Sequence, residues 1–333
     1  MSATGAGLAA TLYRLGDAWV RTRVLRRRVP LLVGFNITFR CNLRCAYCAS
    51  PTLEVPEMDT DQVLRTVDDF YALGMRWITF SGGEPLLRKD LGTIIGHVKD
   101  KGIVTFISTN GWLIPKRIRE LLRADRFTIS LDGGERVHDA VRGKNAFAKA
   151  LAGADAAREH GVPLAFTCVL SSYNLDAVDD VLELAARFGA TCMFQPATKW
   201  LDSSSRPNPI APPTDRYRDA IRYLLRRKRE GAPITNSSAG LWYLMHWPDP
   251  APIASTAGRI TCTIEPDGKV TASHVTQGNC LEEQAGGLSA RENYLNLSIP
   301  EMVDQSWCAP ILELDLLFAL NAAAIWNAMK VQR

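Results

Sequence analysis

Three closely spaced cysteines carry the most reactive chemistry in this sequence. Cys41, Cys45 and Cys48 fall within eight residues, directly after an apolar stretch, Leu31–Ile37, that predicts a strand. Three thiolates on one short loop can bind one inorganic centre, but a structural zinc site needs a fourth protein ligand. A four-iron cluster held by three cysteines leaves one iron open to a substrate or cofactor. The spacing therefore indicates an open iron–sulfur site, with a zinc knuckle or buried thiols as the alternatives.

Two further motifs follow predicted strands. Ser81–Pro85 has the sequence Ser-Gly-Gly-Glu-Pro and comes after the apolar run Trp77–Phe80. Its two glycines allow a close backbone approach to a ligand, and Glu84 can accept a hydrogen bond from a ligand ammonium group. An ordinary tight turn between a strand and a helix is the alternative. The third motif starts at Ser130 and ends at Gly143, and it contains Asp132 and Arg142.

In this order, each at the end of a predicted strand, the three motifs resemble those of the radical S-adenosylmethionine (SAM) enzymes over residues 31–196. The resemblance implies that the three cysteines hold a [4Fe–4S] cluster whose open iron binds SAM. One electron then cleaves SAM to a 5′-deoxyadenosyl radical, which takes a hydrogen atom from an unactivated C–H bond. It also implies a reductant such as flavodoxin or ferredoxin.

The resemblance assigns a role to most of the polar residues in these motifs. It implies that Gly82, Gly83 and Glu84 bind the methionyl amine of SAM. It also implies that Arg142 binds the methionyl carboxylate, and a surface salt bridge is the alternative for Arg142. The other predicted contacts with SAM or the cluster are Tyr47, Ser108, Asn110, Ser130 and Asp132. Asn110 with Gly111 is also an ordinary turn pair. Arg40 and Arg44 either favour the anionic cluster or lie in solvent, and His138 is expected to be structural.

The elements that must position these residues alternate between short apolar runs and amphipathic runs. The predicted strands are 31–37, 77–80, 104–109, 127–131, 164–170 and 191–195, and the predicted helices are 60–73, 89–101, 115–123, 146–160 and 175–188. Four of these helices end at a glycine placed as a C-terminal cap. Six β-α repeats predict an α/β fold with a parallel sheet, a partial (βα)6 TIM-like barrel with its chemistry at the carboxyl ends of the strands.

The rest of the chain divides into an N-terminal basic helix (1–30), a linker (197–213) and a small C-terminal α+β extension (214–333). Within the extension, the sequence predicts a helix over 215–229, a hairpin over 261–271 and a long apolar helix over 311–329. The extension resembles the SPASM or twitch type, in which cysteines bind an auxiliary cluster. Ser255 and Ser273 occupy two of the cysteine positions of that pattern. Cys262, Cys280 and Cys308, with His274, are the remaining candidates for a second iron–sulfur cluster, and a degenerate cap over the substrate pocket is the alternative.

Composition narrows the class of protein. The 333 residues are 47% hydrophobic and 22% charged, with a net charge of +4. No apolar run approaches the roughly 20 residues that span a bilayer. Eight cysteines without a secretory signal favour metal or redox use in the cytoplasm. Arg14–Arg28 predicts either a basic helix at a membrane surface or, as favoured, one packed on the domain, and no stacking pattern indicates a nucleic-acid partner.

The sequence therefore predicts a radical SAM enzyme acting on a small natural-product or lipid-type substrate. A maturase of a ribosomal peptide or protein is the first alternative, weakened because only about 30 residues precede the first strand, too few for a leader-binding domain. A non-enzymatic iron–sulfur electron carrier is the second, but it would leave the Gly-Gly-Glu-Pro motif and Arg142 without a purpose.

Overall fold

The computed structural model describes residues 5–201, 206–272, 288–297 and 307–331. Within these residues, eight strands form one sheet in the order β6-β5-β4-β3-β2-β1-β7-β8. The strands are β1 (Leu32–Thr38), β2 (Trp77–Gly82), β3 (Val104–Thr109), β4 (Arg126–Ser130), β5 (Leu164–Leu170), β6 (Thr191–Pro196), β7 (Thr261–Ile264) and β8 (Val270–Thr271). Neighbouring strands from β6 to β7 run parallel, and β7 and β8 pair antiparallel.

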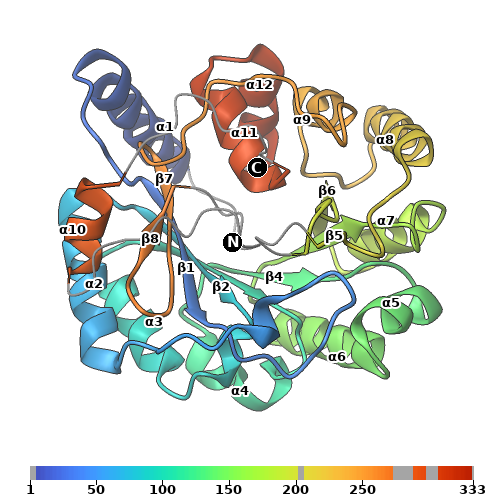
Figure 1. Ribbon diagram of the computed structural model, residues 1–333, viewed down its shortest axis with the longest axis horizontal. Helices are drawn as coiled ribbons and strands as arrows, with labels where there is room; N and C mark the ends of the chain where they lie inside the picture. The colour runs from blue at the N-terminus through green and yellow to red at the C-terminus, as the bar shows by residue number, and fades with distance from the viewer. Residues whose placement is uncertain (1–4, 202–205, 273–287, 298–306, 332–333) are drawn as a thin grey trace.

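The sheet curves into an open arc with helices along its outer side (Figure 1). The helices are α1 (Gly5–Trp19), α2 (Thr60–Leu73), α3 (Leu91–Asp100), α4 (Ile114–Leu121), α5 (Glu135–Arg142), α6 (Ala146–Glu159), α7 (Val178–Arg187), α8 (Thr214–Arg229), α9 (Ser238–Leu244), α10 (Ala290–Leu295), α11 (Ala309–Phe318) and α12 (Ala322–Val331). A π-helix, η1 (Val20–Val24), continues α1, and short 3-10 turns lie at η2 (Ser50–Thr52) and η3 (Pro85–Leu87). The predicted partial (βα)6 barrel is confirmed.

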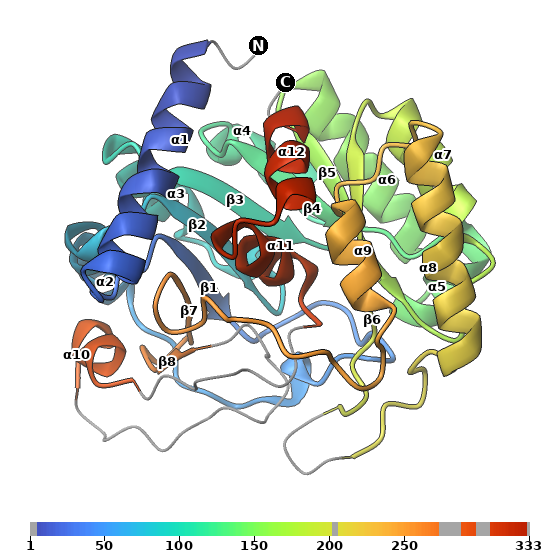
Figure 2. The same ribbon diagram turned by 90° about the horizontal axis from the view of Figure 1, so that it is seen from above.

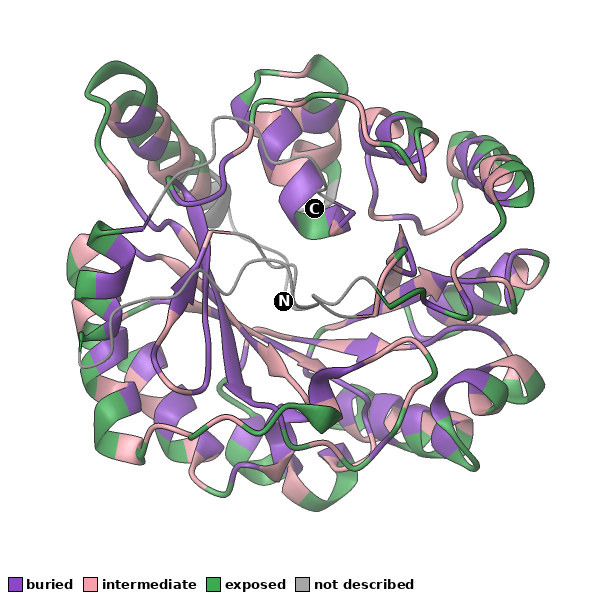
Figure 3. Cartoon of the chain, viewed as in Figure 1, coloured by how far each residue is buried: buried purple, intermediate pink, exposed green. Residues whose placement is uncertain are grey.

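The chain makes these elements for local reasons that the sequence displays. Asp59 and Gln62 form a reciprocal capping box at the start of α2, and Gly74 ends that helix in the left-handed conformation with φ of 118°. Along β1, Val33, Phe35 and Ile37 belong to the buried core that the outer helices cover, so the residues between them face the inside of the arc. Figure 3 shows the strands mostly buried and the outer faces of the helices exposed.

The C-terminal extension is continuous with the barrel rather than a separate unit. Strand β7 pairs in parallel with β1, from Leu32 opposite Thr261 to Phe35 opposite Ile264, so the sheet continues into the extension. The segment predicted as a linker also packs on the barrel. Asn208 and Ile210 are buried, and the backbone N–H of Ser172 donates to the carbonyl of Ile210 at 3.0 Å.

The prediction of a single apolar helix over 311–329 is wrong, because the chain turns within this segment. The structure breaks it into α11 and α12, which are bent by 117°. Leu320 takes a left-handed conformation with φ of 60°, and the Asn321 side chain accepts hydrogen bonds from the N–H groups of Ala323 and Ala324. Asn321 thus caps a new helix, which the apolar pattern of the sequence did not reveal.

Helix α1 packs on the barrel, as the favoured interpretation of the basic segment expects. Ala18 lies in a small apolar cluster with Leu31, Ile260 and Phe318. Leu12 and Tyr13 on the same helix stay exposed. Among the described residues, no single helix has the length and apolar character to cross a membrane, although the bent pair α11 and α12 passes that test by length and composition.

Candidate functional site

The cysteine loop leaves the carboxyl end of β1. Cys41, Cys45 and Cys48 are all half-buried. The N–H of Cys48 donates to the carbonyl of Cys45 at 3.0 Å, and the N–H of Leu43 points at Cys41 Sγ at 3.4 Å. A further backbone bond of 2.9 Å joins Ala46 to Val141 on α5. The loop is therefore fixed both at the end of β1 and at α5.

The charge balance of the loop fits an iron–sulfur cluster. Burial raises the pKa of Cys41, and it raises the pKa of Cys45 to about 11, with the negative charge of Cys48 adding to both effects. Three thiolates therefore need a cationic centre to stay deprotonated together, and iron supplies one. Among the described residues no three Cys, His, Asp or Glu side chains lie close enough to hold one metal ion. In a four-iron cluster each thiolate binds a different iron, so the sulfur atoms need not converge on a point.

The Gly-Gly-Glu segment locks against the start of the cysteine loop. The N–H of Gly83 donates to the Thr38 carbonyl at 2.7 Å, and the N–H of Glu84 donates to the Arg40 carbonyl at 2.8 Å. A Cβ on Gly83 would lie 2.3 Å from the Arg40 oxygen, and one on Gly82 would lie 2.3 Å from the Thr38 oxygen. Both positions need glycine because the loop backbone itself approaches them. The sequence predicted a close approach of a ligand, whereas the structure shows a close approach of the chain.

Glu84 connects the ends of β2 and β3. Its side chain is 0% exposed, and its carboxylate accepts from the N–H groups of Leu86 (3.0 Å) and Asn110 (2.8 Å) and from Thr109 Oγ1 (2.8 Å). The Asn110 side chain donates in turn to Asn42 Oδ1 in the cysteine loop at 2.8 Å. The carboxylate has one lone-pair direction left for a ligand amine. The predicted contact with SAM stays a prediction, and the structure adds a framework role.

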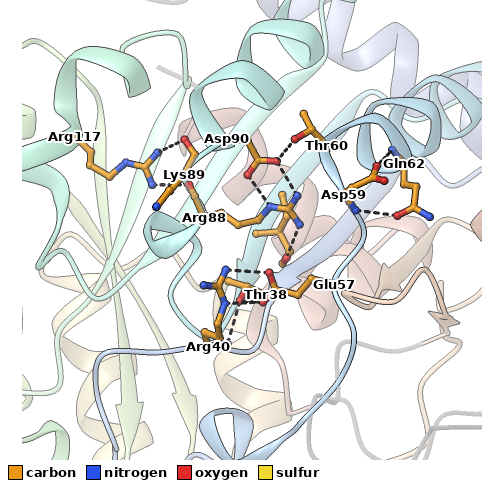
Figure 4. Close-up of polar contacts among 11 residues, drawn as sticks. Thr38, Arg40, Glu57, Asp59, Thr60, Gln62, Arg88, Lys89, Asp90 and Arg117 are labelled. Atoms are coloured by element: carbon orange, nitrogen blue, oxygen red, sulfur yellow. Dashed lines mark hydrogen bonds and ion pairs between the residues drawn. The ribbon is translucent and has the colours of Figure 1, made fainter.

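Ion pairs hold the first residues of the loop (Figure 4). Arg40 binds the Glu57 carboxylate with two nitrogens, at 2.9 and 3.0 Å, and Thr38 Oγ1 donates to the same carboxylate. Beside them, Arg88 pairs with Asp90 at 2.8 and 2.9 Å and donates to the carbonyl of Ile37 at 3.2 Å. The charge of Arg40 is thus already balanced by Glu57.

A buried charged group lies on the other side of the loop. Asp132 is 0% exposed and accepts from Arg142 Nε at 2.6 Å, while Arg142 is 6% exposed and its Nη1 lies 3.9 Å from Cys45 Sγ. Arg142 also donates to the Tyr47 hydroxyl, which itself donates to Asp132 at 3.2 Å. The surface salt bridge considered for Arg142 is therefore wrong, because this ion pair is buried against the cysteine loop.

Asp132 has a further partner in β5. Its second oxygen accepts from the N–H of Val169 at 2.9 Å. The predicted contact of Asp132 with SAM stays a prediction, and the structure adds a framework role. His138 is structural, as expected. Burial lowers the pKa of His138 to about 4, with the Arg142 cation adding to the effect, and the neutral ring accepts from the N–H of Asp132 at 3.1 Å.

Ser108 and Ser130 are the predicted contacts that stay open. Both are half-buried near the carboxyl ends of β3 and β4, and neither hydroxyl has a hydrogen-bond partner among the described residues. Because alternate residues of neighbouring parallel strands share a face, the two hydroxyls face the same side of the sheet. They are available to a ligand at the carboxyl end of the sheet, and their contact with SAM remains a prediction.

Sequence reasoning missed a carboxylate that the extension brings to this end of the barrel. Glu265 follows β7 and accepts from Asn36 Nδ2 on β1 at 3.0 Å, and Asn36 accepts from Ser81 on β2 at 2.9 Å. Burial raises the pKa of Glu265 to about 7 despite the Asn36 hydrogen bond. The sequence did show a glutamate directly after an apolar strand and just before the turn at Asp267-Gly268. The pairing of β7 with β1, which the sequence did not reveal, brings Glu265 to the carboxyl end of the barrel.

The cysteines of the extension do not assemble in the described part of the chain. Cys262 is a residue of β7 whose side chain lies in the hydrophobic core, where burial raises its pKa. Cys308 precedes α11, and burial raises its pKa to about 11. Cys280 and His274 lie outside the described residues. Cys262 is therefore a core residue rather than the predicted cluster ligand, because the alternation of β7 turns its side chain away from the inside of the arc.

Comparison with known families agrees with this arrangement. The family model described as the radical SAM superfamily matches residues 35–185, which contain all three motifs. Residues 35–185 therefore form a radical SAM domain. Radical SAM enzymes use a [4Fe–4S] cluster and SAM, and these are the cofactors of this chain. Cys41, Cys45 and Cys48 are the residues that would hold the cluster.

Curated relatives match this radical SAM chain over about half its length. It is 35% identical over 169 residues to an AdoMet-dependent heme synthase of Methanosarcina barkeri, covering 48% of each chain. It is 34% identical over 162 residues to an Fe-coproporphyrin III synthase of the same organism, covering 46% of this chain and 41% of the relative. The chain thus spans about half the length of the curated relatives it matches.

Solved structures share the fold at low identity. SuiB of Streptococcus suis bound to S-adenosylmethionine superposes with a TM-score of 0.65 and 14% identity, covering 85% of this chain and 69% of SuiB. The protein anSMEcpe with bound AdoMet superposes with a TM-score of 0.59 and 18% identity, covering 74% of this chain and 75% of the other. At this identity the likeness concerns the fold of the radical SAM chain.

Proposed function

We propose that this radical SAM enzyme cleaves SAM reductively and removes a hydrogen atom from an unactivated C–H bond of a small organic substrate. The observation that carries the proposal is the locking of the cysteine loop onto the Gly-Gly-Glu segment by the bonds from Gly83 and Glu84. When bound, the cluster and SAM supply a 5′-deoxyadenosyl radical. An electron carrier would need the cluster but not the buried Asp132–Arg142 pair or the open hydroxyls of Ser108 and Ser130.

The residues of the chain contribute positioning and exclusion of water. Arg142 presents its guanidinium to Cys45 while Asp132 balances its charge, which stabilises negative charge on that sulfur without placing a free cation in the site. Glu84 fixes the end of β3 against β2, so Ser108 and Asn110 keep their positions relative to the cysteine loop. Such preorganisation is what radical chemistry needs from the protein. We expect a flavodoxin- or ferredoxin-type reductant.

The names of the curated relatives favour a small molecule over a peptide. Both are tetrapyrrole synthases, and their identity to this chain is 34–35%. A macrocyclic tetrapyrrole is therefore the first substrate class to test. A peptide substrate is the alternative. This chain shares its fold, at 14% identity, with SuiB, whose structure was solved with the precursor peptide SuiA bound.

The test of the chemistry is anaerobic reconstitution with iron and sulfide, followed by incubation with SAM and dithionite. We expect about four irons per chain and formation of 5′-deoxyadenosine. The Cys45→Ala variant should lose the product, whereas Cys192→Ala, a core cysteine in β6, should retain it. A reconstituted protein that binds no iron, or a Cys45→Ala variant that still forms the product, would contradict the proposal.

The test of the substrate class is a titration followed by absorption spectroscopy. Iron-coproporphyrin III and heme, the products that the relatives' names give, should each shift their main absorption band on binding. A precursor-type peptide of matched size serves as the comparison. If neither macrocycle binds and the peptide increases 5′-deoxyadenosine formation, the substrate is a peptide.

A further inference from the structure

A cavity of about 320 Å³ lies at the amino ends of the strands, away from the cysteine loop. Leu32 and Trp77 open β1 and β2, and both line the cavity together with Arg126, the first residue of β4. The cysteine loop starts after Thr38, at the other end of β1. A seven-residue strand is about 20 Å long, so the cavity and the cluster site are separate.

Most of the cavity wall is apolar. Phe106 and Met193 contribute from the inside of the barrel, and Leu15, Leu317 and Ala328 contribute from α1, α11 and α12. Figure 2 shows α1 and α12 on the same side of the molecule, near both ends of the chain. The size and the apolar wall with few polar groups are those of a small-ligand site.

Arg126 is a cation that lines this cavity, and no described residue pairs with it as a counter-charge. Its guanidinium lies 4.2 Å from the centre of the Phe106 ring. Its Nε is buried without a hydrogen-bond partner, and among the described residues no carboxylate lies within ion-pair distance of it. Burial lowers the pKa of Arg126. An arginine nitrogen that is buried without a hydrogen-bond partner is costly, and a bound anion would satisfy it.

Glu313 also lines the cavity but serves a different partner. Its Oε1 accepts from the N–H of Ser237 at 2.7 Å, and its charge is felt by Lys228 rather than by Arg126. A second cation lies nearby instead, because the Arg14 guanidinium is 5.6 Å from the centre of the Trp77 ring. Among the described residues, two cations thus lie at or beside the cavity, and its lining carboxylate is engaged by Ser237.

We propose that this cavity binds a small amphipathic anion, whose charged head pairs with Arg126 and whose apolar chain lies along Leu15, Leu317 and Ala328. A medium-chain carboxylate has both features. The planar guanidinium stacked on Phe106 presents its remaining N–H groups for bidentate binding of a carboxylate. The site is distinct from the radical SAM site and does not depend on the proposed reaction.

Isothermal titration calorimetry of the full chain with decanoate tests the proposal. Arg126→Gln should weaken binding at least tenfold, and decanol, which has the same chain without the charge, should bind at least tenfold more weakly than decanoate. Arg119→Gln, an exposed arginine on α4, is the matched control and should bind as the wild type does. Leu317→Trp, which fills the cavity and leaves Arg126 in place, should also weaken binding at least tenfold.

Two further variants keep the outcome decisive. Arg126→Lys covers the case in which Arg126→Gln fails to fold. It keeps the positive charge but loses the bidentate guanidinium, so decanoate should bind it more weakly than the wild type and still more tightly than decanol does. Cys45→Ala should bind decanoate as the wild type does, because the cluster loop is at the other end of the barrel. No binding to the wild type, equal binding of decanol, unchanged binding in Leu317→Trp, or loss in Cys45→Ala would each overturn the proposal.

Discussion

At the carboxyl end of the barrel, Arg142 lies 2.6 Å from the Asp132 carboxylate and Arg40 binds Glu57 with two nitrogens. At the amino end, Arg126 rests on Phe106 with no acidic partner in the described part of the chain. The first end pairs these two arginines with carboxylates, and the hydroxyls of Ser108 and Ser130 lack partners among the described residues. The second end leaves a cation uncompensated. A charged side chain that stabilises the framework thus has an oppositely charged partner within the chain, whereas a charged side chain that is available to a ligand lacks one.

The largest effect should follow from breaking the buried pair. Asp132→Ala leaves Arg142 buried without a counter-charge, which should lower the free energy of unfolding by about 3–5 kcal/mol. Chemical denaturation measures it. Asp176→Ala removes the partner of Arg216 from an exposed pair and should cost less than about 1 kcal/mol. Equal losses in the two variants would show that burial does not distinguish these ion pairs.

Glu265 is the exception at the carboxyl end, a buried carboxylate whose hydrogen-bond partner among the described residues is Asn36. Its pKa of about 7 lies above the ordinary value of 4.5, so the folded state binds more protons than the unfolded state between these values. The free energy of unfolding should therefore fall by about 2–3 kcal/mol as the pH rises from about 4.5 to about 7. Glu265→Gln should flatten this part of the profile. An unchanged slope in the variant would assign the pH dependence to other groups.

A smaller effect is expected where the chain approaches itself. Gly83→Ala places a Cβ 2.3 Å from the Arg40 carbonyl oxygen, which should cost about 1–3 kcal/mol and lower the iron content after reconstitution. Gly96→Ala on α3 is the control, because its Cβ would have only an ordinary contact of 3.5 Å with Arg123. That control should leave stability unchanged or raise it by about 0.5–1 kcal/mol. Full iron loading of Gly83→Ala would argue that the loop tolerates displacement.

The smallest effect on stability is expected at the amino end of the barrel, at Arg126. Arg126→Gln removes a half-buried cation that has no acidic partner among the described residues, so the free energy of unfolding should stay within about 1 kcal/mol of the wild type or rise. Thermal and chemical denaturation measure it. A loss as large as that of Asp132→Ala would mean that Arg126 is a framework residue after all.

The sequence was sufficient for the barrel because its signals are local. Apolar runs at strand length, helices ending at Gly74 or Gly161, and the turn at Asp267-Gly268 each depend on neighbours along the chain. The break at Leu320 was missed because an apolar pattern does not show whether a helix turns. The partners of Asp132 and Glu84 were missed because they come from strands far apart in sequence, as with Val169 and Asn110.

The pairing of β7 with β1 has a consequence for the order in which the molecule is made. Strand β1 meets β2 within about 40 residues, but its other edge stays unpaired until Thr261–Ile264 have been synthesised. During translation, the strand that carries the cysteine loop therefore presents an open edge while about 220 residues emerge from the ribosome. A pairing so distant in sequence also raises the contact order and slows folding. The strand that leads into Cys41, Cys45 and Cys48 thus gains its second neighbour only after most of the chain has been made.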